Sequence, residues 1–112
     1  MNWIVRELPE VQEDLNKLDR GKRKQVLKAI DRVSQNPLPQ SEGGYGKPLG
    51  NKGNVNLTGC YKIKLRDAGI RIVYRLQRTE HGMEIVIIGM HESAEVYDLA
   101  AKRIEKYDTK AN

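Results

Sequence analysis

Basic residues with a regular spacing dominate the stretch from residue 62 to residue 78. This stretch carries six lysines and arginines and only one acidic residue, so its charge equals the +5 of the whole chain. Side chains alternate between the faces of a β-strand, and the cations occupy alternate positions along much of the stretch. Such a one-sided positive face is typical of a surface that binds phosphate groups, most commonly a nucleic-acid backbone. The six are Lys62, Lys64, Arg66, Arg71, Arg75 and Arg78.

The register of this hairpin can be predicted from its turn. A two-residue loop at Ala68-Gly69 would place like charges opposite each other, which costs stability unless an anion or an acidic partner is bound. The alternative is a solvated polar face on a half-buried hairpin. The predicted pairs are Arg66 with Arg71, Lys64 with Val73, and Lys62 with Arg75.

The elements around the hairpin follow from the spacing of apolar residues, which predicts an α+β fold with its helices on one face of an antiparallel sheet. An N-terminal strand and a helical hairpin precede a three-stranded antiparallel meander and a C-terminal helix. The run at 85–88 is apolar on both faces and indicates a central strand. The predicted strands are 3–8, 60–66, 70–78 and 84–90; the helices begin at Glu10, after Gly21 and at Ser93 or Ala94.

Each predicted helix has a stripe of apolar residues at helical spacing. The stripes should face the core of one domain that spans residues 1–112. Residues 36–56 are rich in glycine and proline, which predicts a long, mobile loop that has a functional role or becomes ordered on a partner. The stripes are Val11, Leu15 and Leu18; Val26, Leu27, Ile30 and Val33; and Val96, Leu99, Ala100 and Ile104.

Several classes of protein are excluded by what the sequence lacks. No apolar stretch approaches the length of a membrane span, and the N-terminus does not have the pattern of a signal peptide, which predicts a cytoplasmic protein. Cys60 is the single cysteine, so no internal disulfide is expected. Two separated histidines, His81 and His91, do not form a zinc-binding pattern, and we expect neither a metal nor another cofactor.

Four short motifs resemble the RelE branch of the RelE/ParE toxins of bacterial toxin–antitoxin systems. The resemblance covers nearly the whole chain and implies a RelE-like microbial RNase fold. It also implies a cytoplasmic endoribonuclease that cuts mRNA in the ribosomal A site without a metal and is inhibited by a cognate antitoxin. The motifs are Cys60-Tyr61-Lys62-Ile63-Lys64-Leu65-Arg66, Gly69-x-Arg71-x-Val73-Tyr74, Gly89-x-His91 and Glu95-Val96-Tyr97.

The resemblance also implies roles for individual residues. Cleavage of RNA by the neighbouring 2′-hydroxyl needs a base, a cation beside the phosphorane and an acid for the leaving 5′-oxygen. Lys62 and Lys64 match the family's lysine pair and are expected to abstract the proton and contact the phosphate. Arg71 would stabilise charge in the transition state, and Tyr97 would position a nucleotide by stacking or simply pack in the core. The remaining cations, Arg66, Arg75 and Arg78, would bind RNA.

One position departs from the family pattern. His91 stands where the RelE branch often carries an arginine, and an imidazole can donate a proton to the leaving oxygen whereas an arginine only stabilises charge. Two other functions remain open at this point. ParE-like relatives inhibit DNA gyrase and lack the lysine pair, and a non-catalytic module would bind nucleic acid without cutting it.

Overall fold

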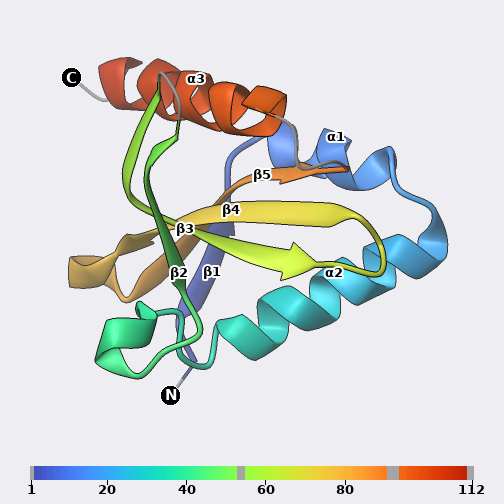
Figure 1. Ribbon diagram of the computed structural model, residues 1–112, viewed down its shortest axis with the longest axis horizontal. Coiled ribbons are helices and arrows are strands. Elements are labelled where there is room, and N and C mark those ends of the chain that lie inside the picture. The colour runs from blue at the N-terminus through green and yellow to red at the C-terminus, as the bar shows by residue number, and fades with distance from the viewer. Residues whose placement is uncertain (1, 53–54, 91–93, 111–112) are drawn as a thin grey trace.

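The computed structural model describes residues 2–52, 55–90 and 94–110 (Figure 1). Within these residues a single mixed sheet is flanked by helices, with short 3-10 turns at Gln40–Glu42 and Arg78–Glu80. The elements are β1 (Ile4–Glu7), α1 (Glu10–Asn16), α2 (Arg20–Val33), β2 (Lys47–Lys52), β3 (Val55–Leu65), β4 (Ile70–Gln77), β5 (Gly82–Gly89) and α3 (Ala94–Lys110).

The sheet has the strand order β1-β5-β4-β3-β2. Strands β3, β4 and β5 form the predicted antiparallel meander, and β1 pairs with β5 in parallel. The predicted strand at 84–90 is an interior strand, since β5 lies between β1 and β4. The fold class is therefore α+β, as the sequence predicts.

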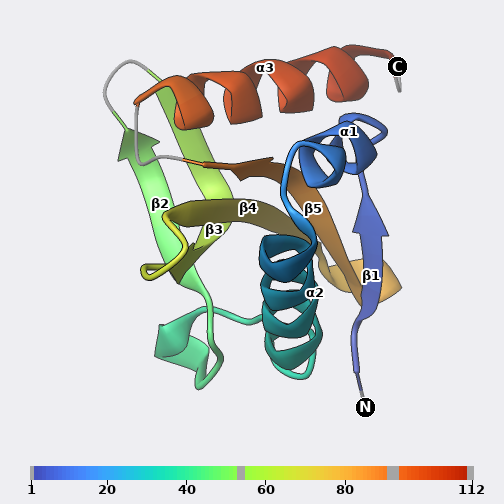
Figure 2. The same ribbon diagram turned by 90° about the vertical axis from the view of Figure 1, so that its right-hand side faces the viewer.

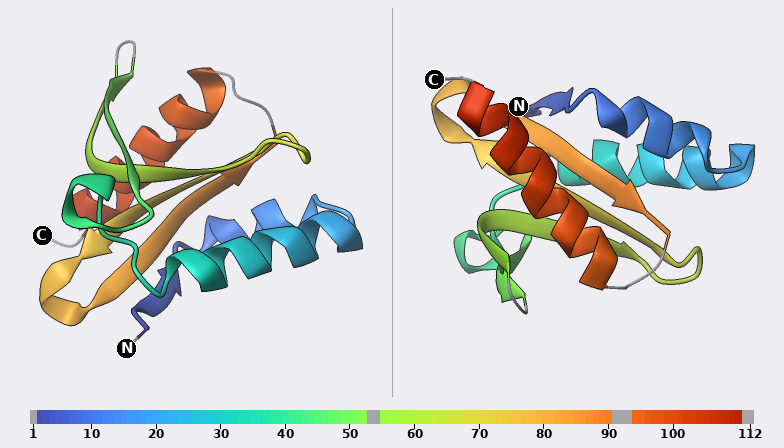
Figure 3. Two further views of the ribbon diagram at one scale, coloured as in Figure 1. Left: turned by 60° about the horizontal axis from the view of Figure 1, so that its bottom comes forward. Right: turned by 90° about the horizontal axis from the view of Figure 1, so that it is seen from above.

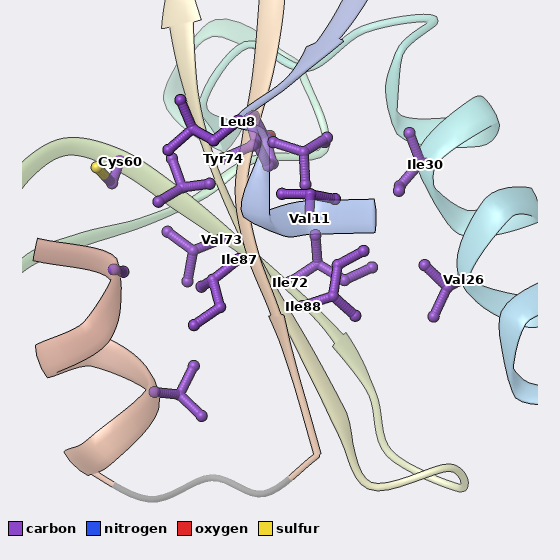
Figure 4. Packing of buried hydrophobic residues seen from close by; sticks show 14 of the residues in the cluster. Leu8, Val11, Val26, Ile30, Cys60, Ile72, Val73, Tyr74, Ile87 and Ile88 are labelled. Atoms are coloured by element: carbon purple, nitrogen blue, oxygen red, sulfur yellow. The ribbon is translucent and has the colours of Figure 1, made fainter. Parts of the chain in front are cut away.

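Helices cover both faces of the sheet, so the prediction that they pack on one face is wrong. The hairpin of α1 and α2 lies on one side and α3 on the other (Figures 2 and 3). The physical reason lies in the interior strands, which are apolar on both faces. Ile72 and Ile88 point toward α2, whereas Val73 and Ile87 point toward α3 (Figure 4), so each face needs a cover.

Local sequence signals explain where the helices start. α1 begins directly after Pro9, and its first turn carries the acidic residues that favour a helix N-terminus. α2 is capped by Asp19, whose carboxylate accepts a hydrogen bond from the backbone N–H of Lys22 at 2.8 Å. The predicted stripes are buried, except that Leu27 of α2 is 54% exposed, Leu99 of α3 is 40% exposed and Ile104 is half-buried.

The described part of the segment 36–56 contains a strand that belongs to the sheet, so the prediction that the whole segment is a loop is wrong. It contains β2, which pairs with an extended β3 that starts at Val55 rather than at Cys60. The buried hydroxyl of Tyr74 donates a hydrogen bond to the carbonyl of Pro37 at 2.8 Å. A side chain at Gly46 would place its Cβ 2.7 Å from that hydroxyl, which explains the glycine there.

The register of the β3–β4 hairpin is shifted by two residues from the predicted one. Leu65 pairs with Ile70, and Gly69 adopts a left-handed φ of 68° in a turn of four residues instead of two. Lys64 therefore lies opposite Arg71, and Lys62 lies opposite Val73. A shift of two residues preserves the face of each strand side chain, so the basic residues within the two strands still share one face; they are Lys62, Lys64, Arg71 and Arg75.

Candidate active site and cationic surfaces

Three of the predicted catalytic residues lie on one face of neighbouring strands. Lys64 of β3, Arg71 of β4 and Gly89 of β5 form one row across the sheet, because each is the register partner of the next. Lys62 lies on the same face as this row, two residues before Lys64 on β3. We call Lys62, Lys64 and Arg71 the Lys–Arg cluster.

Arg71 is the most enclosed member of the Lys–Arg cluster. It is 9% exposed, while Lys62 and Lys64 are half-buried. Its Nη1 donates a hydrogen bond to the carbonyl of Ile70 at 3.1 Å, which fixes the guanidinium close to its own strand. An arginine keeps its charge under almost all conditions, so this position supplies a fixed cation in an environment with little water.

Helix α3 lies over the face that carries the cluster. Val96 seats the start of this helix on β5, because a Cβ at Gly89 would lie 2.7 Å from a Val96 methyl. Tyr97 is 7% exposed on α3, a helix that packs against β3 and β5. The fold thus brings Tyr97 to the same side of the sheet as the Lys–Arg cluster and encloses it there. His91 and its neighbour Glu92 lie outside the described residues.

Two of the three predicted RNA-binding arginines form ion pairs within the protein. Arg75 bonds the carboxylates of Glu84 at 2.6 Å and Asp108 at 2.9 Å, and these bonds raise the pKa of Arg75 and lower the pKa of Asp108. Arg78 makes two hydrogen bonds to Glu42, at 2.7 and 3.0 Å.

The third predicted arginine differs from the other two. Arg66 is exposed in the turn after β3, and no ion pair is recorded for it among the described residues. Because Arg75 and Arg78 are paired with carboxylates, less positive charge is available to an external ligand at these two positions than the sequence suggests.

A second group of cations was not identified from the sequence. Helix α2 carries six basic residues and one acidic residue, and two of the basic ones line a groove that also reaches β3. The excess of basic over acidic residues along α2 indicates these cations in the sequence, but it has no regular spacing such as the alternation in the hairpin. The basic residues of α2 are Arg20, Lys22, Arg23, Lys24, Lys28 and Arg32.

Cys60 contributes no nucleophile to the site. It is buried in β3 opposite Arg75, and burial raises the pKa of its thiol to about 11. The thiol is therefore protonated at neutral pH and acts as a small apolar side chain.

The arrangement can bind a phosphate group and stabilise extra negative charge on it. Two amines and a fixed guanidinium lie on one face, and a phenol is close to that face on α3. This combination of groups fits a reaction in which charge accumulates on a phosphorus centre.

None of the helices among the described residues has the length and hydrophobicity of a membrane span.

Comparison with known proteins points to one family. No family model matches the sequence. The mRNA interferase toxin RelE of Escherichia coli K12 is 33% identical over 88 residues, which cover 79% of this chain and 82% of the relative. The chain belongs to the RelE family of mRNA interferase toxins, a family of endoribonucleases.

Solved structures agree with this assignment. A double mutant of the E. coli RelE toxin in the free state matches with a TM-score of 0.70 and 28% identity, and covers 93% of this chain and 99% of its own. The same mutant in complex with a peptide of the antitoxin RelB matches with a TM-score of 0.66 and 28% identity, over 92% and 98% of the two chains.

Proposed function

We propose that this RelE-family toxin cleaves mRNA in the ribosomal A site, by metal-free attack of the 2′-hydroxyl on the neighbouring phosphate. The observation that carries the proposal is the Lys–Arg cluster, in which Lys64 lies directly opposite the enclosed Arg71. The amines of Lys62 and Lys64 share this face with the Arg71 guanidinium, so a base, a phosphate contact and a fixed cation lie together. Its partners are then the ribosome with its mRNA and a cognate antitoxin, and it acts in the cytoplasm.

The residues take separate roles in this reaction. Lys62 and Lys64 abstract the 2′-hydroxyl proton and contact the phosphate, and Arg71 stabilises the charge that develops on the phosphorane. Tyr97 stacks on a nucleotide of the substrate. Arg71 and Tyr97 are both buried, so contact between the substrate and these two side chains requires a rearrangement that exposes them.

The test uses purified protein and translating ribosomes, with mRNA ends mapped after incubation. We expect cuts within the A-site codon that leave 2′,3′-cyclic phosphate and 5′-hydroxyl ends. The Lys62→Ala, Lys64→Ala double variant should cleave at least about a hundredfold more slowly. Arg23→Ala, Lys102→Ala is the matched control, because it removes the same charge from exposed positions on α2 and α3.

Other results would favour the other functions. Inhibition of DNA gyrase without new mRNA ends would indicate a ParE-like toxin. Binding of ribosomes or RNA without cleavage would indicate a non-catalytic module. Cleavage by the double lysine variant at the control's rate would refute the roles given to Lys62 and Lys64.

The role of His91 needs its own experiment. If this imidazole protonates the leaving 5′-oxygen, single-turnover cleavage falls as the pH rises through the imidazole pKa. His91→Arg should then remove that limb of the pH profile although it keeps a positive charge. Superimposable profiles of the two proteins, measured with chemistry rate-limiting on saturating ribosome complexes, would exclude the acid role.

A further inference from the structure

A large groove lies between α2, the segment that precedes β2, and the edge of β3. Its volume is about 890 Å³, at the upper end of the range for small-ligand pockets. Pairing between β2 and β3 ends at Lys47 and Lys62. The last residues of β3 therefore have no β2 residue beside them, and they line the groove. The residues that carry the argument are Lys28, Arg32, Tyr45, Lys47 and Arg66.

Positive charge lines the groove on opposite sides. Lys28 and Arg32 come from α2, while Lys47 and Arg66 come from the β2 and β3 side. All four are exposed, and among the described residues none has a recorded ion pair, in contrast to Arg75 and Arg78. Asp67 is the one carboxylate in the described lining. Cations on both walls suit a chain of phosphates that runs between them.

An aromatic platform stands in one wall of the groove. Tyr45 is 45% exposed, and the guanidinium carbon of Arg32 lies 5.4 Å from the centre of its ring. The Tyr45 backbone is held in place, since its N–H donates to the carbonyl of Asn36 at 2.9 Å. The next residue back, Gly44, has no room for a side chain, because a Cβ there would lie 2.1 Å from the Leu38 carbonyl oxygen. A rigid, half-exposed ring beside an arginine is a stacking surface for a nucleobase.

We propose that this groove binds the single-stranded mRNA next to the cleavage site, with its phosphates on Lys28, Arg32, Lys47 and Arg66 and a base on Tyr45. This inference rests on the proposed function, because the RNA in the groove is the mRNA strand that the toxin cleaves. Lys62 and Lys64 also contribute to the lining. Since α2 and the Lys–Arg cluster lie on opposite faces of the sheet (Figure 3), an RNA strand in the groove reaches the cluster by passing around the edge of β3 beyond Lys62, where β2 no longer pairs with it.

RNA fits this groove better than an acidic protein segment does. Exposed cations on both walls can each take a phosphate of a strand between them, and stacking on Tyr45 uses the face of any base. Two glutamines, Gln25 and Gln40, add hydrogen-bonding groups for base edges or riboses. A peptide would match the charge but would not need an aromatic ring supported by a guanidinium.

Direct binding provides the first test. A short, fluorescein-labelled, single-stranded RNA with 2′-O-methyl groups is bound but not cut, so affinity is measured apart from catalysis. Lys28→Ala, Arg32→Ala should lower the affinity at least tenfold at low salt, and should reduce the slope of log affinity against log salt by roughly 1.4. Tyr45→Ala should weaken binding roughly fivefold or more and leave the salt slope unchanged.

The matched control is again Arg23→Ala, Lys102→Ala, which removes two exposed charges outside the groove lining. Equal affinities and salt slopes for the control and the groove variant would overturn the proposal. Normal RNA binding by the groove variant together with weakened antitoxin binding would overturn it in favour of a protein ligand.

Ribosome assays distinguish mRNA from ribosomal RNA as the occupant. If the groove holds the substrate strand, the groove variant is impaired on long mRNA but equals the wild-type protein on mRNA that stops at the A-site codon. A defect that persists on the truncated mRNA would assign the groove to ribosomal RNA and contradict the proposal. Oligonucleotide binding without any cleavage on ribosomes would count against the proposed function and leave the groove assignment intact.

Discussion

Arg71 is the residue at which the sequence pattern and the structure differ most in their consequences. Strand alternation assigns it correctly to the basic face, and on that basis its truncation should leave no cavity. In the structure Arg71 is only 9% exposed and lies on the face of the sheet that α3 covers. The sequence could not show this, because α3 was expected on the other face of the sheet and alternation along a strand does not reveal how deeply a side chain is enclosed.

The buried position of Arg71 predicts different outcomes for two substitutions. Arg71→Ala should lower both the cleavage rate and the free energy of unfolding, the latter by about 1–3 kcal/mol, because it opens a cavity. Arg71→Lys keeps most of the volume and the charge, so it should fold normally yet still lose activity through its lack of a planar guanidinium. Urea denaturation and single-turnover cleavage measure the two effects. An active Arg71→Lys protein would show that charge alone is required.

Cys60 provides a pH-dependent test of burial. With a thiol pKa of about 11, only about one molecule in a thousand carries a thiolate at pH 8, so alkylation of the native protein should be slow. The unfolded chain, with a thiol pKa of about 8.5, should react readily. Since the folded pKa is the higher one, this residue stabilises the fold below about pH 8.5, and that contribution is lost as the pH rises toward 11. Rapid alkylation of the native protein at pH 8 would contradict its burial.

At the scale of elements, strongly alternating segments could be predicted and weakly patterned ones could not. β4 and β5 follow from their apolar runs. β2 was missed because its sequence, Lys47–Lys52, combines a proline and a glycine with one buried leucine, Leu49. Its pairing with β3 depends on a tertiary partner rather than on propensity, which a single sequence does not reveal.

A buried ion pair links three elements. β1 pairs with β5 only as far as Ile85, and beyond it the N–H of Ile88 donates to the carboxylate of Asp14 on α1 at 3.1 Å. Arg103 of α3 donates to both oxygens of that carboxylate, at 2.7 and 3.0 Å, and to the carbonyl of Val86. Asp14 thus completes the edge of β5 and holds α3 to α1.

We expect Arg103→Ala to cost about 3–5 kcal/mol of unfolding free energy, because it leaves a buried carboxylate without its counter-ion. The exposed pair of Lys106 and Glu10, at 3.2 Å between the same two helices, is the matched control. Lys106→Ala should cost less than about 1 kcal/mol. Urea denaturation compares the two variants, and equal losses would show that Asp14 is as well solvated as Glu10.

On the scale of the whole molecule, α3 covers the face of the sheet that carries the Lys–Arg cluster (Figure 3). Its apolar residue Leu99 is 40% exposed, beside a pocket of about 260 Å³ between α1, β5 and α3. An amphipathic antitoxin helix could occupy this side of the molecule or replace α3 on the sheet.

Hydrogen exchange can test this mode of inhibition. On saturation with the cognate antitoxin, we expect protection to change in 94–110 or in the hairpin 62–78. The free toxin at the same concentration is the reference, and a change limited to other segments, with both of these regions unaffected, would rule out the proposed mode.

The parallel pairing of β1 with β5 has a consequence for the synthesis of the toxin. The first strand of the chain finds its partner only when residues 82–85 are available, and the Lys–Arg cluster needs β3, β4 and the helix after β5. Contacts between such distant parts of a chain form slowly and late. While residues 82–89 are still inside the exit tunnel, the nascent chain cannot complete its sheet, because β1 and β4 both pair with β5. During synthesis the five-stranded sheet therefore closes only after residues 82–85 have left the ribosome.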